Sequence, residues 1–237
     1  MKNKNILFHS LVYLCAIIFL FGRCKSSSST FKKQQNANVI IIVIDALRYD
    51  HLNCYGYEKN TTSPNIDKLA LDGILFLNAF SQAPWTKPSI ASLFTSLYPS
   101  QHGVLDEPVM ISGDEKRKRI VTRGDVLDES LTTLAEVMQK NGYITAAFIN
   151  NVHLSAEMGF AQGFENYHDR LGIARNLNAK AIEFLNESEN KNNKFFLYLH
   201  YIDPHLPYLP PLGKEIFPSA STEIDWLDNE YIRANIS

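Results

Sequence analysis

Residues 39–45 have the sequence VIIIVID, and this short stretch decides the fold class. Six consecutive β-branched residues are typical of a strand buried on both faces, as the strands of parallel sheets are. The run ends at Asp45, where a carboxylate loses part of its hydration and needs a cation or hydrogen-bond donors beside it. Asp45 is therefore a candidate ligand of a cation, and a helix cap or an ion pair with Arg48 explains it equally well.

Patterns typical of helices and strands alternate along the rest of the chain. Ser63 and Pro64 form a helix start, and Gly73 offers a stop for that short helix. Further strands are expected over 74–79, 144–149 and 195–201, and further helices over 89–96, 130–141 and 174–187. Strands that alternate with helices indicate βαβ units, so we expect an α/β fold with a mostly parallel central sheet flanked by helices.

Ligands of such folds bind beyond the carboxyl ends of the strands. Asp45 follows the first strand directly, and the segment Asp203–His205 follows the last one. Thr86 lies just before the predicted helix 89–96, where unpaired N–H groups and the helix dipole favour an anion. Taken alone, Thr86 is more simply explained as a helix cap, because threonine is common in that position.

Several blocks of sequence follow one another in a recognisable order: VIIIVIDALRYDHL at 39–52, SPNIDKLA at 63–70, TKPS at 86–89, SLFTSLYPSQHGV at 92–104 and FFLYLHYIDPHLPY at 195–208. Together they resemble the N-terminal part of the catalytic domain of the sulfatase family, within the alkaline phosphatase superfamily. The resemblance implies the three-layer fold of that family over residues 38–237, incomplete at the C-terminus.

The same resemblance implies a role for each of five residues. Asp45 matches a ligand of the divalent metal ion, and Thr86 occupies the position of the nucleophile, which also contacts the metal. His205 matches a histidine that contacts the substrate or its leaving group. Lys87 and His153 are the expected substrate-binding residues, although His153 fits a surface loop equally well. The implied cofactor is calcium, manganese, zinc or magnesium, and the implied substrate is a sulfate or phosphate ester.

Two departures from the family pattern bear on the chemistry. Sulfatases carry a cysteine or serine that becomes formylglycine, which cannot be made from Thr86, whereas threonine nucleophiles occur in phosphodiesterases and phosphoethanolamine or phosphoglycerol transferases of the superfamily. Ile90 replaces the arginine of the nucleophile motif. We therefore expect a metal-dependent hydrolase or transferase that works through a covalent intermediate on Thr86. The alternative is an inactive or fragmentary protein with a binding or vestigial role.

The metal site is incomplete on sequence grounds. Asp45 and Thr86 provide only two ligands, whereas a divalent cation takes at least four. The resemblance implies further ligands from a later Asp-His-Gly or Asp-Asn segment that follows another strand. We find no such segment, since Asp225 and Asp228 do not follow a predicted strand. A complementing C-terminal fragment is therefore an expected partner.

The N-terminus has the pattern of an export signal. Lys2 and Lys4 precede an apolar run over 6–21, and Cys24 is followed by a serine-rich stretch. We interpret 1–24 as a signal peptide or lipoprotein leader and 25–37 as a polar tether, with an uncleaved anchor as the alternative. Each interpretation places the rest of the protein outside the cytoplasm, in the cell envelope, and a lipid or an uncleaved anchor would attach it to the membrane. The net charge of −2 over 237 residues argues against nucleic-acid binding.

Overall fold

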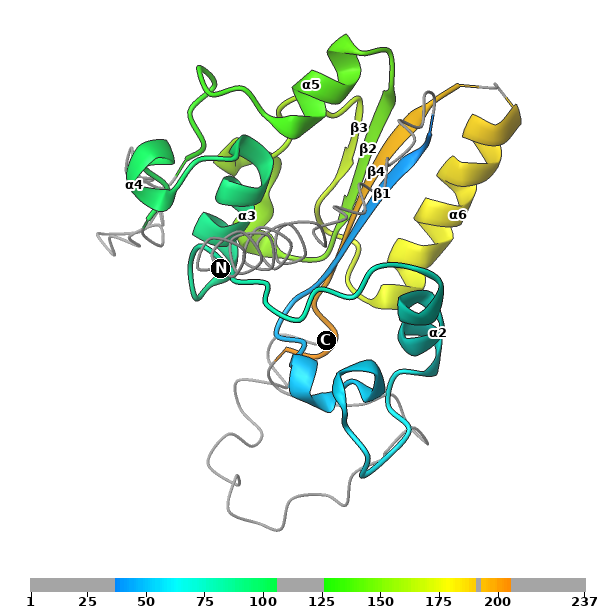
Figure 1. The fold of residues 1–237 in the computed structure, drawn as a ribbon. Coiled ribbons are helices and arrows are strands. Elements are labelled where there is room, and N and C mark those ends of the chain that lie inside the picture. Colours follow the sequence, from blue (N-terminus) through cyan, green and yellow to red (C-terminus); the bar gives the residue numbers. More distant parts are fainter. Residues whose placement is uncertain (1–36, 106–125, 191–192, 206–237) are drawn as a thin grey trace, which may run out of the picture. The chain divides into compact units, whose positions relative to one another are not determined.

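The computed structural model describes residues 37–105, 126–190 and 193–205 (Figure 1). The predicted leader, and the tether up to residue 36, lie outside these ranges. The described elements are β1 (Val39–Ile44), α2 (Pro64–Asp72), α3 (Thr86–Thr95), α4 (Pro99–His102), α5 (Leu134–Lys140), β2 (Ile144–Ile149), β3 (Asn166–His168), α6 (Ala174–Asn190) and β4 (Phe195–Tyr201), with short 3-10 helices at Tyr49–His51, Asn53–Tyr55, Val152–Leu154 and Ala156–Met158. Among the helices of these ranges, none has the length and apolarity needed to cross a membrane.

The described strands form one parallel sheet in the order β1-β4-β2-β3. In the register of this sheet, Ile44 lies opposite Tyr201, and Ile149 lies opposite His200. The carboxyl ends of β1, β4 and β2 therefore meet at one edge of the sheet. The parallel sheet confirms the predicted α/β class, and the bounds predicted for 144–149 and 195–201 are those observed.

Helices cover both faces of the sheet, which gives three layers (Figure 1). Side chains alternate along a strand, so Phe195, Leu197 and Leu199 of β4 pack on the side of α6. The intervening Phe196 and Tyr198 belong to the core on the other side, which is formed with α3 and α5. The three-layer arrangement expected from the sequence is confirmed.

The expectation that β1 is buried on both faces is wrong for one face. Ile40 and Ile42 are 47% and 56% exposed. They lie opposite Leu197 and Leu199 in the sheet, so they are on the side of α6. That helix packs over β4 and β2 and does not reach far enough to cover the edge strand β1.

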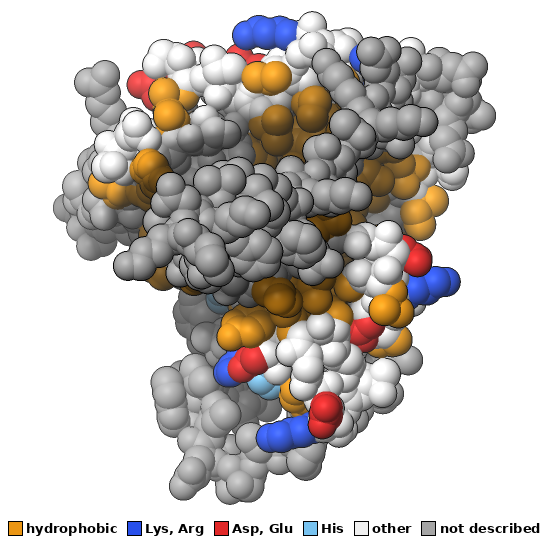
Figure 2. Space-filling model, in the orientation of Figure 1, with side chains coloured by type: hydrophobic (Ala, Val, Ile, Leu, Met, Phe, Trp, Pro, Cys, Tyr) orange, Lys and Arg blue, Asp and Glu red, His pale blue; other side chains and the backbone are white. Residues whose placement is uncertain are grey.

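The predicted strand over 74–79 is also absent, since these residues form bends and irregular structure. Its apolar side chains are exposed, with Ile74, Phe76 and Leu77 at 67%, 68% and 76%. Figure 2 shows hydrophobic side chains at the surface in several places on one face of the molecule. An apolar run becomes a strand only beside a partner, and none of the described strands lies next to this segment.

Three helices differ in their bounds from the prediction. Helix α3 starts at Thr86, three residues early, because Trp85 and not Thr86 is its N-cap. Helix α5 starts at Leu134, where Thr133 and Glu136 form a reciprocal capping box that fixes its first turn. Helix α6 continues to Asn190. Helix α2 ends at Asp72 with Gly73 as its C-cap, as expected.

Gly163 brings a loop against the start of α5. It has a φ of +82°, and a Cβ added to it would lie 2.3 Å from the Glu136 backbone nitrogen. Its carbonyl oxygen accepts a hydrogen bond of 2.8 Å from the Thr145 hydroxyl of β2. This close approach ties the sheet to the capped end of α5, and only glycine fits it.

We predict that Gly163→Ala lowers the free energy of unfolding by more than about 2 kcal/mol, because it adds a backbone clash to a strained φ. Gly142→Ala is the matched control, since Gly142 has a φ of +79° with nothing within 4 Å of the added Cβ. It should cost about 1 kcal/mol, from the backbone conformation alone. Urea unfolding of both variants measures the difference, and equal losses would contradict the close packing.

Candidate functional site

The candidate site lies where the carboxyl ends of β1, β4 and β2 meet. The Asp45 backbone N–H donates to the Tyr201 carbonyl over 2.8 Å, which continues the sheet pairing one residue beyond β1. Ala46 then takes a φ of +57°, a strained value for a residue with a side chain, and turns the chain away from the sheet. Asp45 is thus held in a fixed position at the end of its strand.

Three polar side chains converge on one oxygen of Asp45. Oδ2 accepts a hydrogen bond of 2.7 Å from the Thr86 hydroxyl and one of 3.0 Å from the Asn151 side-chain amide. The Nε2 atom of His200 lies 3.5 Å from the same oxygen. The structure therefore brings the predicted pair Asp45 and Thr86 together from positions 41 residues apart.

The Asp45 carboxylate is an anion at neutral pH, although only 18% of its side chain is exposed. Burial raises its pKa, but the contacts with His200 and Thr86 outweigh this effect and lower the pKa to about 2. The charge of the nearby His205 acts in the same direction. The site is thus a partly buried negative charge that two hydrogen-bond donors and a histidine stabilise.

His200 and Asn151 were not predicted from the sequence to lie at this site. His200 is 1% exposed and its Nδ1 atom lies 2.8 Å from the Tyr198 hydroxyl. Burial raises the pKa of Tyr198, and the charge of Asp45 adds to this, so the phenol stays protonated. The sequence feature that could have indicated His200 is its position two residues after Tyr198, on the same face of the strand. Asn151 carried no comparable signal.

The remaining predicted residues lie around this centre. His205 follows β4, and its N–H donates to the Ile202 carbonyl over 2.8 Å in a turn. His153 packs edge-to-face on Trp85, with ring centroids 6.1 Å apart. Trp85 is the residue immediately before Thr86. Lys87 is fully buried within α3. His153 thus packs against the residue that precedes Thr86, and Lys87 follows Thr86 in the sequence. His205 lies close enough to Asp45 to lower the pKa of that carboxyl.

A comparison with protein families decides the identity of the fold. The model of the sulfatase family matches residues 37–224. The chain belongs to the sulfatase family. An N-acetylglucosamine-6-O-sulfatase of Bacteroides thetaiotaomicron is 25% identical to it over 224 residues, which cover 82% of this chain and 36% of the relative.

Solved structures show the same fold. A structure of a protein in complex with its substrate D-glucosamine-2-N,6-O-disulfate has a TM-score of 0.59 at 22% identity, covering 79% of this chain and 40% of that one. The phosphonate monoester hydrolase of Agrobacterium radiobacter has a TM-score of 0.56 at 21% identity, covering 74% of this chain and 42% of that one. The present sulfatase-family chain spans less than half the length of each of these proteins.

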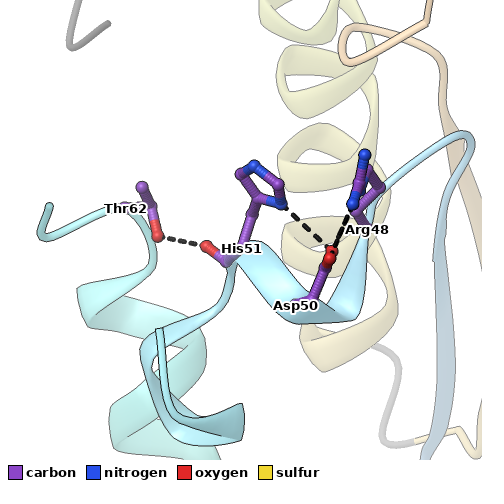
Figure 3. A network of polar contacts seen from close by, with 4 residues as sticks. All are labelled: Arg48, Asp50, His51 and Thr62. Carbon is purple, nitrogen blue, oxygen red and sulfur yellow. Dashed lines mark hydrogen bonds and ion pairs between the residues drawn. The ribbon is translucent and has the colours of Figure 1, made fainter. Parts of the chain in front are cut away.

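An ion pair with Arg48 was one of the alternative roles considered for Asp45. In this sulfatase-family chain, Arg48 forms a bidentate ion pair with Asp50 (Figure 3). The two nitrogen–oxygen distances are 2.9 and 2.6 Å. His51 also contacts Asp50, and its carbonyl accepts a hydrogen bond from the Thr62 hydroxyl. Arg48, followed by His51, holds the pKa of Asp50 far below its usual range. This exposed cluster shapes the loop after β1.

The donor set around Asp45 fits a divalent cation. The described residues contain no group of three or more histidine, cysteine, aspartate or glutamate side chains that could hold a metal ion. They do bring one carboxylate, one hydroxyl and one imidazole together, from Asp45, Thr86 and His200. The buried Nε2 atom of His200 has no hydrogen-bond partner in the structure. Buried polar atoms are normally satisfied, whereas the contact of this nitrogen with Asp45, at 3.5 Å, is longer than a normal hydrogen bond.

Helix α3, which presents Thr86, is fastened to α4 by a buried pair. Nε2 of His102 lies 3.0 Å from the Ser92 hydroxyl, and the Val104 N–H donates to Nδ1 over 3.1 Å. Because Nδ1 accepts, Nε2 carries the proton in the neutral ring and donates it to Ser92. Burial lowers the pKa of His102 below 6.5, although a hydrogen bond to the backbone of Pro88 opposes the shift.

We predict that this fastening weakens with acid. The unfolded chain binds a proton at His102 more readily than the folded one, so the free energy of unfolding falls as the pH drops below about 6.5. The variant His102→Gln should show a smaller loss between pH 7.5 and 5.5. Chemical denaturation at both pH values measures this, and identical losses in the two proteins would show that His102 is not involved.

Proposed function

We propose that this chain carries the nucleophile and the first metal ligand of a metal-dependent hydrolase or transferase of sulfate or phosphate esters. The observation that carries the proposal is the hydrogen bond of 2.7 Å from the Thr86 hydroxyl to Asp45 at the start of α3. Membership of the sulfatase family and the fold shared with a substrate complex of a disulfated sugar support the ester class.

Thr86 acts as the nucleophile in this proposal, and Asp45 orients it. With a pKa of about 2, Asp45 is too weak a base to remove the hydroxyl proton by itself. Asp45 and Thr86 would hold a divalent cation, which would lower the pKa of the Thr86 hydroxyl and offset charge on the ester. The Thr86 oxygen then loses its proton to solvent and forms a bond to sulfur or phosphorus while the bond to the leaving alcohol breaks.

The surroundings of Thr86 suit an anionic group. Thr86 is the first residue of a ten-residue helix, so unpaired backbone N–H groups and the positive end of the helix dipole lie beside it. We propose that Lys87 adds a positive charge, that His153 contacts the substrate, and that His205 donates a proton to the departing oxygen. Water, or an acceptor alcohol, then releases the group from Thr86.

The choice between sulfate and phosphate rests on two opposing observations. The family and its curated relative favour sulfate esters. Thr86 and Ile90, which stand where sulfatases carry the formylglycine precursor and an arginine, favour phosphate esters. We propose a phosphate or phosphonate ester as the substrate of this chain, with a sulfate ester as the second candidate.

We also propose that further polypeptide completes the fold, as a complementing segment on a second chain or beyond this sequence. The exposed side chains of Ile40 and Ile42 on β1, and of Ile74, Phe76 and Leu77 after α2, support this idea. Ile40 and Ile42 lie on the same face of β1, and adjoining exposed apolar side chains are typical of sites that bind another protein segment. Export through the leader, with Cys24 lipidated, is proposed on the sequence pattern alone.

The proposal is tested by removing the hydroxyl of Thr86. We predict that Thr86→Ala lowers hydrolysis of 4-nitrophenyl phosphate and 4-nitrophenyl sulfate by on the order of 10³-fold or more, as loss of a catalytic nucleophile does. Thr86→Ser keeps a hydroxyl and should retain measurable activity. Thr95→Ala, at the other end of α3, is the control and should behave as the unaltered chain. Release of 4-nitrophenol in the presence of Mn²⁺, Zn²⁺ or Ca²⁺ gives the rates.

Retained hydrolysis in Thr86→Ala would overturn the assignment of the nucleophile. Absence of hydrolysis of both esters by the unaltered chain with every metal would instead favour the inactive or fragmentary protein.

A further inference from the structure

His200 has the features of a residue built to bind something. It is a titratable side chain with 1% exposure, far below what histidines usually show. Its Nδ1 atom is satisfied by the Tyr198 hydroxyl at 2.8 Å, whereas its Nε2 atom has no hydrogen-bond partner. The unsatisfied nitrogen faces the Asp45 carboxylate, 3.5 Å away, and does not point into the apolar core.

The distance between these two atoms is informative. At 3.5 Å the contact is longer than a normal hydrogen bond from a ring nitrogen to oxygen. Two donors that bind one tetrahedral ion at about 2.0–2.1 Å lie about 3.3–3.4 Å from each other. The observed separation therefore suits two ligands of one ion better than a direct bond. The Thr86 hydroxyl lies 2.7 Å from the same carboxylate oxygen in a direct hydrogen bond, so it must turn away from Asp45 to bind the same ion.

We propose that His200 binds the divalent cation directly through Nε2, together with Asp45 and Thr86. This inference rests on the proposed function, in which Asp45 and Thr86 face the cation. It adds a third protein ligand, which gives the three protein donors and one open position of catalytic zinc sites. The open position is where an ester oxygen or water would enter.

Tyr198 sets the orientation of the imidazole in this arrangement. A histidine that binds a metal usually donates its other N–H to an outer partner, which fixes the ring and makes the ligating nitrogen more basic. The Tyr198 oxygen is in the place of that partner, and Tyr198 itself belongs to the core formed with α3. Tyr198 is thus a positioning residue.

The ligand set also selects the kind of metal. Imidazole nitrogen binds zinc, manganese and similar transition ions well, whereas calcium and magnesium take oxygen ligands. A site with His200 as a ligand therefore prefers Zn²⁺, Co²⁺ or Mn²⁺ to Ca²⁺. This narrows the four metals that the sequence left open, and it makes the choice of metal depend on one residue.

The first experiment measures metal affinity and not activity. Equilibrium dialysis of the full chain with Zn²⁺, Co²⁺ and Ca²⁺ gives dissociation constants for the unaltered protein, His200→Gln, Tyr198→Phe and the control His168→Gln. His168 is an exposed histidine on β3, with its ring stacked on Phe148. We expect His200→Gln to bind Zn²⁺ and Co²⁺ more than about 100-fold more weakly, and Tyr198→Phe about 10–100-fold more weakly. Ca²⁺ binding should change little, and His168→Gln should match the unaltered chain.

The second experiment does not depend on the folding of a His200 variant. Pulsed EPR of the Mn²⁺-loaded protein detects the nitrogen of a directly bound imidazole. The double variant His153→Gln/His205→Gln removes the other two histidines near the site, and we expect it to keep the nitrogen signal. A lost signal in that double variant overturns the proposal.

Three outcomes separate this inference from the function on which it rests. Weak binding in His200→Gln with the nitrogen signal kept in the double variant supports it. Zn²⁺ binding of unchanged strength in a folded His200→Gln, checked by circular dichroism, overturns it and leaves the proposed function standing. Absence of Zn²⁺, Co²⁺ and Mn²⁺ binding by the unaltered chain overturns both.

Discussion

The candidate site depends on one buried negative charge. The Asp45 carboxylate has lost most of its hydration, and a lone anion in such a place is costly unless donors or a cation surround it. Thr86, Asn151 and His200 are drawn to it from three different elements of the chain. The low pKa of Asp45 shows that these contacts more than compensate for its burial. The carboxylate therefore holds the start of α3 against the ends of β1, β2 and β4.

The parallel sheet makes this convergence possible. Because β1, β4 and β2 are parallel neighbours in register, residues at their carboxyl ends meet without any long loop. The alternation along β4 then divides its side chains between two tasks. Leu197 and Leu199 fill the core beneath α6, while Tyr198 and His200 face the side of α3, where Thr86 begins the helix. The site and the core therefore share one strand, and neither can shift its register alone.

Local patterns in the sequence predicted most of the strands of the sheet, but they failed where the structure depends on contacts between distant segments. The bounds of β1, β2 and β4, and the choice of Asp45 and Thr86 as candidate site residues, came from apolar runs, strand ends and the family resemblance. The strand expected over 74–79 failed because strand formation depends on a partner, which a local pattern does not contain. His200 and Asn151 were missed for a related reason. They lie beside Asp45 because the strands are ordered β1-β4-β2, and this order cannot be predicted from any single segment of the sequence.

The electrostatics of the site lead to one further step. A carboxylate with a pKa of about 2 can hold the Thr86 hydroxyl in place, but it gains little by taking its proton at neutral pH. In the motif of the nucleophile, Ile90 stands where the family pattern has an arginine, so this position contributes no charge to activate the hydroxyl. The positive charge that the chemistry needs must then come from Lys87, from the α3 terminus or from a bound cation. Of these sources we propose the cation, because the Nε2 atom of His200 faces the Asp45 carboxylate at 3.5 Å and has no hydrogen-bond partner. A metal ion held by Asp45 and His200 would then supply the positive charge that is lost where Ile90 replaces the arginine.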